Sequence, residues 1–390
     1  MIPGCTGLEN GSVRGKIRAV RARDLDIVVG TGQPGRTNSI TDVGGVSVGH
    51  CTLVAGEGQL IRGAGPVRTG VTVVLPSADH RGWVRPVFAA AHVLNGNGEM
   101  TGLAWVGESG LLTSPIGLTN THSVGVVRDE LVALEVGRRP TTEDFWGLPV
   151  VGETWDGRLN DCNGFHVRPE HVRVALEDAT DGPVVEGNVG GGTGMVCHGF
   201  KGGIGTASRV TAAGDTVGVL VQANHGWRRR LSVNGAPVGL ALDERRVPVP
   251  QARDSALHQG AGSIIGLVAT DAPLLPHQCR RLAQRSSLGV ARLGGLGEHS
   301  SGDLFLAFAT GNELSVGFGE PQRRTQHLQM LVDEHLDAIF EATVEATEEA
   351  ILNALVAAET MTGRDGITAY ALPHDMLVDV LDRHGLRRTR

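Results

Sequence analysis

A serine stands directly after a flexible glycine and directly before an apolar run in the segment Ala261-Gly262-Ser263-Ile264-Ile265. A serine hydroxyl becomes a good nucleophile only with a base close by, and a terminal α-amine, with a pKa of about 7.7–8.0, is such a base. A break between Gly262 and Ser263 would therefore create nucleophile and base together. The same residues also suit a loop that enters a buried strand, so the decision rests on their surroundings.

A second pair of polar side chains, Ser301 and Asp303, precedes an apolar run at 304–308. Residues two apart on an extended segment point to the same face. A carboxylate behind a hydroxyl can hold it in position and favour a nearby ammonium group, as in other activated nucleophiles. The alternative is a Ser-Gly-Asp turn that only starts a strand.

Two further polar residues stand where apolar runs end. Asn224 follows the run 219–221, and its amide NH₂ is a suitable donor to the oxyanion of a tetrahedral intermediate. Glu153 follows the run 149–151 and offers a carboxylate that could hold a substrate's ammonium group. Each residue also fits a structural turn.

The composition limits the classes of protein to consider. With 390 residues, of which 41% are hydrophobic, the chain can bury the core of one large domain or two ordinary ones. A net charge of −7 argues against a nucleic-acid partner, and we expect Arg228-Arg229-Arg230 to be solvated surface. Basic residues interrupt the first 23 positions, and no run is long enough to span a membrane. We expect a cytoplasmic protein without a membrane partner.

The sequence also argues against a metal or another cofactor. The five cysteines are odd in number and form no CxxC pair, which favours free thiols over a disulfide framework or a zinc knuckle. His122, His198 and His225 lack the spacing of a recognisable metal site. We therefore expect no metal and no cofactor.

The elements that position these residues can be read from periodicity. Short runs rich in Val, Ile, Leu and Phe predict strands at 71–75, 124–127, 217–222, 263–269 and 303–309. Continuous apolar runs of this kind indicate strands that are covered on both faces.

Two long helices are predicted, at 274–288 and at 325–360. In the second, Leu336 and Phe340 lie on an apolar face, and Glu341 and Glu345 lie on a polar one. Strands followed by helices without a low-complexity linker predict one layered α/β domain. The segment 227–262, rich in Arg, Asp, Pro and Gly, predicts an exposed connection whose new end could withdraw after cleavage.

Two glycine motifs compete with this hypothesis. Residues 30–35 fit G-x-G-x-x-G, but Pro34 and the turn-forming residues that follow do not open a helix, which argues against dinucleotide binding. Residues 45–49 fit G-x-S-x-G around Ser47, but the alternating valines indicate a strand, whereas a nucleophile elbow requires a helix directly afterwards.

Many ordered blocks of the chain match one known family. The matching blocks are 38–43, 48–50, 95–102, 119–121, the segment around Glu153, 190–195, 221–226, 262–277 and 301–311. Over nearly its whole length the chain resembles the L-aminopeptidase/D-Ala-esterase/amidase and β-aminopeptidase family of self-processing hydrolases.

The resemblance implies a four-layer αββα fold like that of the N-terminal-nucleophile hydrolases. It implies one domain, 1–390, cut after Gly262 into an α chain, 1–262, and a β chain, 263–390. It further implies that such αβ pairs assemble into homo-oligomers.

Carried over by position, the family's catalytic roles fall on residues already singled out. Ser263 resembles the nucleophile, Ser301 and Asp303 its proton relay, Asn224 an oxyanion donor and Glu153 the anchor of the substrate amine. One position departs from the pattern, because Trp155 stands where similar enzymes carry a tyrosine. An indole N–H can only donate, so either Trp155 Nε1 polarises the substrate carbonyl or Asn224 with main-chain amides suffices.

The resulting expectation is a serine aminopeptidase or amidase that acts on short peptides, amides or esters with a free amino group through an acyl-enzyme. Two alternatives remain open. One is an endo-amidase that acts on linear or cyclic amides without a free amine. The other is an unprocessed, non-catalytic relative that serves in binding or assembly.

Overall fold

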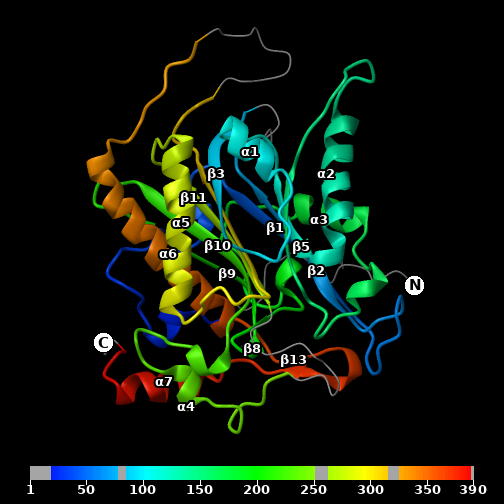
Figure 1. Cartoon of the computed structure of the whole chain (residues 1–390), viewed down its shortest axis with the longest axis vertical. Helices are drawn as coiled ribbons and strands as arrows, with labels where there is room; N and C mark the ends of the chain where they lie inside the picture. The colour runs from blue at the N-terminus through cyan, green and yellow to red at the C-terminus, as the bar shows by residue number, and fades with distance from the viewer. Residues whose placement is uncertain (1–18, 78–84, 251–261, 315–324, 388–390) are drawn as a thin grey trace.

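The computed structural model describes residues 19–77, 85–250, 262–314 and 325–387, and within them two β-sheets form the centre of the molecule (Figure 1). The larger sheet has six strands in the order β4 (Leu111–Leu112), β3 (Val87–Gly96), β12 (Gly302–Ala309), β11 (Ser263–Thr270), β10 (Thr216–Asn224) and β9 (Gly203–Val210). The smaller sheet has four strands in the order β1 (Ser47–Ala55), β2 (Val67–Leu75), β5 (Ile116–Asn120) and β6 (Val150–Thr154).

Helices cover the outer face of each sheet. Helices α5 (Pro276–Arg292) and α6 (Leu336–Val356) pack on the six-stranded sheet, and α2 (Val124–Arg138) and α3 (Pro169–Glu177) pack on the four-stranded sheet (Figure 1). Shorter elements complete the chain: α1 (Leu103–Ser109), β7 (Val196–Cys197), β8 (Phe200–Lys201), α4 (Val238–Ala241), β13 (Met361–Thr362), β14 (Thr368–Ala369) and α7 (His374–Arg383).

Strand β11 shows how the sequence specifies these layers. Ile265 and Leu267 point into the core between the two sheets, whereas Ile264 and Val268 point into the core beneath α5 and α6. Both faces of the strand are therefore covered, which explains its unbroken apolar run. The layer order is αββα, so the predicted fold class is confirmed.

The sheet order interleaves the two halves of the sequence. Strands β11 and β12, which follow residue 262, lie between β10 and β3, which precede it. The β11–β12 pair is parallel, and both flanking pairings are antiparallel. Neither half could complete the six-stranded sheet alone.

Most of the predicted elements are present, with one change of type. The strands predicted at 71–75, 217–222, 263–269 and 303–309 lie within β2, β10, β11 and β12. The strand predicted at 124–127 is wrong, because these residues form the first turn of α2. Val124, Val127 and Leu131 are buried at helical spacing, a period that four residues are too few to reveal. The helix predicted at 325–360 is shorter and spans α6.

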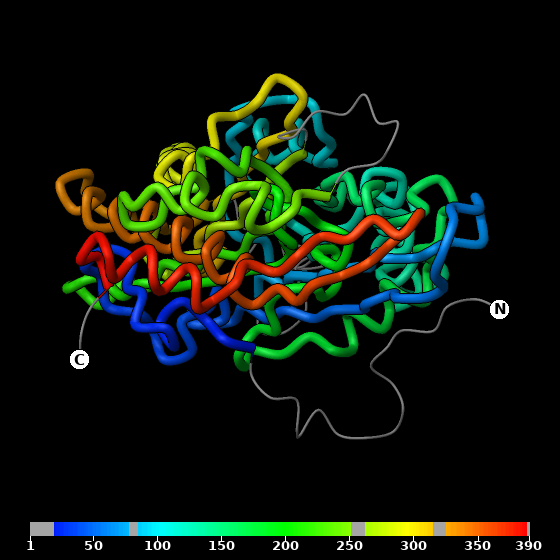
Figure 2. The backbone as a smooth tube through the Cα atoms, turned by 90° about the horizontal axis from the view of Figure 1, so that it is seen from below, coloured from blue at the N-terminus to red at the C-terminus, as the bar shows by residue number. Residues whose placement is uncertain are grey.

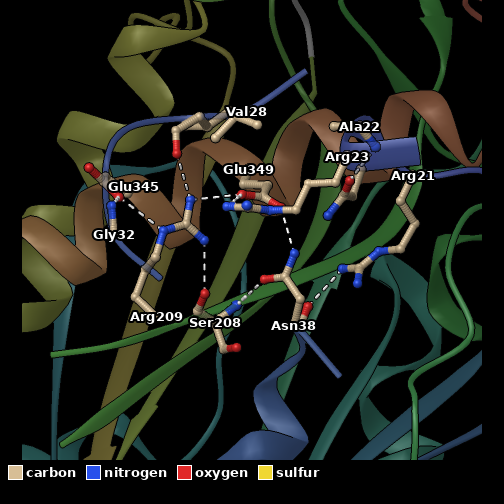
Figure 3. A network of polar contacts seen from close by, with 12 residues as sticks. Arg21, Ala22, Arg23, Val28, Gly32, Asn38, Ser208, Arg209, Glu345 and Glu349 are labelled. Carbon is tan, nitrogen blue, oxygen red and sulfur yellow. Dashed lines mark hydrogen bonds and ion pairs between the residues drawn. The ribbon is translucent and has the colours of Figure 1, made fainter. Parts of the chain in front are cut away.

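A buried ion-pair network joins the N-terminal segment to α6 (Figure 3). Arg209 Nε lies 2.9 Å from Glu345 Oε2, and Arg209 Nη2 lies 2.7 Å from Glu349 Oε2. Arg23 Nε lies 2.8 Å from Glu349 Oε1. Glu345 was expected on the polar face of the helix, and that expectation is wrong, because its side chain is only 4% exposed.

The ends of the described chain lie on one side of the molecule. Figure 2 shows the segment that begins at residue 19, in dark blue, near helix α7, in red. Asp26 and Arg387 connect them with an ion pair of 3.7 Å. The N-terminal segment is therefore an integral part of the structure.

Two expectations about exposed residues are also corrected. Arg228 is buried, and its guanidinium donates to the carbonyl oxygens of His198, Leu242 and Val247. The part of the predicted exposed connection that the structure describes, 227–250, carries core residues and helix α4. Residues 251–261 lie outside the described residues.

The cysteines match the expectation only in part. Cys162, Cys197 and Cys279 are free thiols, whereas Cys51 is disulfide-bonded, contrary to the expectation of free thiols. Among the described helices, none is long and apolar enough to cross a membrane.

Candidate active site

Ser263 is the first residue of β11, in the middle of the six-stranded sheet, and only 5% of it is exposed. Its Oγ accepts a hydrogen bond of 3.1 Å from the main-chain N–H of Gly302, the first residue of β12. Because Gly302 stands between Ser301 and Asp303, this bond places the serine hydroxyl beside the second predicted polar pair. The sheet therefore brings these segments together.

Ser301 and Asp303 form the expected hydroxyl–carboxylate pair. Ser301 Oγ donates a hydrogen bond of 2.6 Å to Asp303 Oδ1, and both residues are buried. Burial raises the pKa of Asp303 to about 6, while hydrogen bonds from Ser301 and from the Ile264 N–H oppose that rise. The carboxylate thus lies against the main chain directly after Ser263, where it can stabilise a positive charge.

Asn224 lies directly opposite Ser263, as its register partner in the antiparallel pairing of β10 with β11. Its amide is held at both ends, since Oδ1 accepts from Val196 N at 2.8 Å and Nδ2 donates to Trp155 O at 2.9 Å. The Nδ2 group carries a second hydrogen that neither bond uses. This hydrogen is available to an oxyanion near Ser263.

Gly262 fits where no side chain could. A Cβ at this position would overlap the main-chain oxygen of Asn224 and would lie 3.4 Å from its Nδ2. The peptide bond predicted to break, between Gly262 and Ser263, therefore follows a residue that packs directly on Asn224. Close approach of two main chains is a common reason for glycine at such a point.

Glu153, next to last in β6, is buried rather than solvated. Its Oε1 accepts from Glu99 N at 2.9 Å, and its Oε2 accepts from the Thr121 hydroxyl. Burial raises the pKa of Glu153, and these two hydrogen bonds oppose the rise. A buried carboxylate with two donors would gain a strong third partner in an ammonium group.

Gly98 packs close to Glu153 and to Gly302. A Cβ on Gly98 would lie 3.3 Å from Glu153 Oε1 and 3.1 Å from the Cα of Gly302, whose N–H binds Ser263 Oγ. Gly98 therefore links the Glu153 carboxylate to the segment that binds the Ser263 hydroxyl.

Trp155 contributes its main chain to this arrangement. Its carbonyl holds the Asn224 amide, and its indole lies against Gly157, where a Cβ would come 2.7 Å from Nε1. The side chain also makes a hydrogen bond to the Cys162 thiol, which opposes the rise in the pKa of Cys162 caused by burial. Of the two alternatives for the missing tyrosine, this favours Asn224 with main-chain amides.

Reasoning from the sequence missed three contributors to the site. They are the hydroxyl of Thr121 and the main-chain N–H groups of Glu99 and Gly302. Thr121 and Glu99 stand in blocks that carried the family resemblance, which was the available signal. A main-chain N–H donor cannot be recognised from the type of the residue that carries it.

The two competing glycine motifs have structural roles. The N–H groups of Thr31 and Gly32 donate to the carboxylate of Glu345 at 2.8 and 2.9 Å, so the G-x-G-x-x-G loop holds a side chain of α6. Ser47 begins β1, and a Cβ on Gly49 would meet the main chain of α3. The interpretation of this second motif as a strand is confirmed.

Two of the three histidines lie together. His198 and His225 form one buried cluster with Cys197, and the possible ligand atoms of the three residues are all within 4.8 Å of one another. His122 lies elsewhere and stacks on Phe165 at 5.8 Å between ring centroids. Linear spacing does not reveal this cluster, because it combines two segments of the chain.

These contacts could support acyl transfer. They place a serine hydroxyl, a hydroxyl–carboxylate pair and an amide donor around the start of β11, and Gly98 connects this group to the buried carboxylate of Glu153. A base for the hydroxyl would come from the α-amine of Ser263 once the chain is cut.

Comparisons with known proteins agree with this chemistry. Residues 38–369 match the model of peptidase family S58. The β-peptidyl aminopeptidase BapA of Sphingosinicella microcystinivorans is 49% identical over 374 residues, covering 93% of this chain and 92% of the relative.

Two solved structures are also similar. A β-aminopeptidase from a Burkholderia species has a TM-score of 0.87 at 53% identity, covering 95% of this chain and 100% of that one. The L-aminopeptidase D-Ala-esterase/amidase of Ochrobactrum anthropi, described as a variant of the Ntn hydrolase fold, has a TM-score of 0.85 at 42% identity, covering 94% and 99%. The chain therefore belongs to peptidase family S58 and is a hydrolase of the aminopeptidase type with an Ntn-hydrolase fold.

Proposed function

We propose that the chain is a self-processing serine aminopeptidase, cut after Gly262, that releases N-terminal residues from short peptides and amides. The observation that carries this proposal is the hydrogen bond from Gly302 N to Ser263 Oγ at 3.1 Å, which places the hydroxyl beside the Ser301–Asp303 pair. Cleavage would divide the domain into an α chain, 1–262, and a β chain, 263–390.

Self-cleavage begins with attack of Ser263 Oγ on the carbonyl carbon of Gly262. The peptide C–N bond breaks as the nitrogen of Ser263 takes a proton, which leaves an ester between Gly262 and the serine oxygen. Water then hydrolyses the ester and releases a carboxylate on Gly262, a free α-amine on Ser263 and its hydroxyl.

In the cut enzyme the α-amine of Ser263 takes the proton from Oγ as the hydroxyl attacks the substrate carbonyl. Asn224 Nδ2 donates to the oxyanion, and Asp303 stabilises the protonated amine through charge. The amine then gives its proton to the leaving nitrogen. Water resolves the acyl-enzyme by the same route in reverse.

We further propose that the preferred substrates begin with a β-amino acid. The support comes from the names of similar proteins. Two of them, at 49% and 45% identity, are called β-peptidyl aminopeptidases, and a third, at 53% identity, is called a β-aminopeptidase. The relative named as an L-aminopeptidase is 42% identical. Glu153 would hold the substrate amine in either case.

Intact mass is the primary test of self-processing. Wild-type protein should give two fragments, one beginning at Ser263, and the Ser263→Ala variant should remain one inactive chain. Ser47→Ala is the matched control, because Ser47 belongs to the other serine motif, and it should be cut and active. A full-length wild-type chain that hydrolyses β-amino acid p-nitroanilides would contradict the proposal.

The substrate preference is tested with two isomeric substrates, β-alanyl and L-alanyl p-nitroanilide, and with N-acetylated β-alanyl p-nitroanilide. We expect kcat/KM to be highest for the first and lowest for the acetylated compound. A higher kcat/KM for the L-alanyl compound would overturn the β-preference. Equal rates with and without the acetyl group would favour an endo-amidase.

We also propose that αβ pairs assemble into a homo-oligomer. Trp105 and Trp146 are 36% and 57% exposed and pack edge to face with ring centroids 6.0 Å apart, and the neighbouring Leu148 is 42% exposed. Exposed aromatic side chains that gather in this way are typical of protein interfaces. Light scattering that gives the mass of a single αβ pair would contradict this proposal.

A further inference from the structure

Behind Asn224 lies a buried cluster of one thiol and two imidazoles that the proposed reaction does not use. Cys197 ends β7, His198 follows it in the turn to β8, and His225 follows Asn224 at the end of β10. The exposed fractions are 0% for Cys197, 0% for His198 and 3% for His225. One ligand atom from each residue lies within 4.8 Å of the other two.

Hydrogen bonding leaves two nitrogens of this cluster without a protein partner. His198 Nδ1 lies 3.1 Å from the main-chain oxygen of Trp227, so it must carry the proton and donate. The lone pair of His198 Nε2 is then free, and that buried atom has no hydrogen-bond partner. His225 Nε2 is also buried and unpartnered. Buried polar atoms in this state are rare and require an explanation.

The third member lies close to His225. Cys197 Sγ is 3.8 Å from His225 Nδ1, and the two imidazole rings meet edge to face at 5.3 Å between centroids. A neutral imidazole and a thiolate are the forms of these side chains that bind metal ions.

The geometry points to a binding site for one zinc ion, held by the Cys197 thiolate and by one ring nitrogen each of His198 and His225. Zinc prefers such sulfur and nitrogen ligands, with bonds of about 2.3 Å and about 2.0–2.1 Å. Tetrahedral bonds of that length place ligand atoms about 3.3–3.6 Å apart, so the side chains need to close by at most about 1.5 Å. The Trp227 carbonyl supplies the outer hydrogen bond that orients a ligating histidine.

The zinc site would hold the two segments that contact and follow Asn224. Val196, whose N–H donates to Asn224 Oδ1, directly precedes Cys197, and His225 directly follows Asn224. An ion that links Cys197 to His225 would therefore fix the orientation of the Asn224 amide. The zinc site does not depend on the proposed function, but an effect on turnover does rest on it.

Cobalt(II) tests the site directly, because cobalt replaces zinc and a thiolate ligand gives it an intense near-ultraviolet absorption. We expect the chelator-treated wild-type protein to bind one cobalt ion per chain with this absorption, and zinc to displace it. Cys197→Ser should abolish the absorption, and His198→Gln and His225→Gln should weaken binding at least about tenfold. Cys279→Ser, another buried free thiol, is the matched control and should behave like the wild type.

A second measurement needs no variant. Zinc sulfate should raise the melting temperature of the chelator-treated wild-type protein, because an ion that binds only the folded state stabilises it, and magnesium sulfate should not. Absence of a cobalt–thiolate band together with an unchanged melting temperature in zinc would overturn the zinc site. A band that persists in Cys197→Ser would also overturn it. If binding is confirmed but kcat is the same with and without zinc, the coupling to Asn224 is wrong and the site is structural.

Discussion

Asn224 and Ser263 face each other across β10 and β11 as register partners, and the Asn224 amide is fixed by Val196 N and Trp155 O. We expect Asn224→Ala to lower kcat by about 10²–10³-fold, because that is the usual cost of losing one oxyanion donor. The assay is steady-state hydrolysis of β-alanyl p-nitroanilide. Asn188→Ala is the control, since its amide bonds the main chain of Glu359, and it should keep full kcat. A fully active Asn224→Ala variant would remove this residue from the oxyanion site.

Glu153 should act on substrate binding through its charge. Glu153→Gln should lower kcat/KM for free-amine substrates by about 10- to 100-fold, because a hydrogen bond to a charged group contributes about 1.5–3 kcal/mol. The loss should not appear with N-acetylated substrates, which have no ammonium group. Glu170→Gln, an exposed acid at the start of α3, is the matched control. Equal losses on both substrate types would indicate a structural role for Glu153.

The Asp303 carboxylate should lower the stability of the folded chain while it supports turnover. Its pKa is raised from 3.8 to about 6, chiefly by burial, so the folded chain holds its proton at a pH where the unfolded chain has lost it. Stability due to this group is therefore present below about pH 4 and is lost as the pH rises to about 6. Removing the charge should raise the free energy of unfolding by about 1–3 kcal/mol at pH 7.5.

Asp303→Asn should accordingly unfold at a higher urea concentration than its parent at pH 7.5 and at the same concentration near pH 4. We would measure this in the uncut Ser263→Ala chain, which unfolds as one molecule. In the cut enzyme, kcat of Asp303→Asn should fall by about 10²–10⁴-fold. A variant with unchanged rate and unchanged stability would show that Asp303 has neither role.

Local sequence patterns predicted the central strands well because their apolar runs are long and are covered on both faces. The run at 124–127 misled because β-branched residues also begin helices, and burial at Val124, Val127 and Leu131 became visible only over two turns. The polar face predicted for α6 was wrong for Glu345 because its partner, Arg209, is 136 positions away. Contacts of this kind arise only from the tertiary fold.

The candidate site divides in the same way. Residue types and the family resemblance identified Ser263, Ser301 and Asp303, and the fold brings these three together. One donor to Glu153 is a main-chain N–H, which could not be predicted from residue type. The buried Cys197 cluster was missed since linear spacing does not report neighbours that meet across two strands.

The Glu349 network should hold the two chains of the cut enzyme together. Glu349 belongs to 263–390, whereas its partners Arg209 and Arg23 belong to 1–262, and its side chain is fully buried. Because Arg209 keeps its pairing with Glu345, Glu349→Gln should cost about 1.5–3 kcal/mol of stability, the contribution of a hydrogen bond to a charged group. Asp382→Asn, which breaks an ion pair at the surface, should leave the urea midpoint nearly unchanged. Urea midpoints of the cut enzymes measure both, and equal midpoints would contradict a role in holding the chains.

Gly262 should be needed for cleavage for a steric reason. A methyl group at this position overlaps the main-chain oxygen of Asn224, so Gly262→Ala must push the start of β11 away from β10. A displacement of about 1 Å at a reacting carbonyl can cost about 10²-fold in rate, and we expect self-cleavage to slow to that extent. Gly44→Ala is the control, because a Cβ there meets no atom within 4 Å, and it should cleave normally.

The cleavage rate is followed by the loss of full-length chain on a denaturing gel after synthesis is stopped. If the α and β chains are instead produced together in one cell from two genes, with 1–262 ending in alanine, the activity of the assembled enzyme should approach that of the wild type. The new chain end is then free to move away from Asn224, so the clash disappears. Normal cleavage of Gly262→Ala would show that the contact with Asn224 does not position the scissile carbonyl.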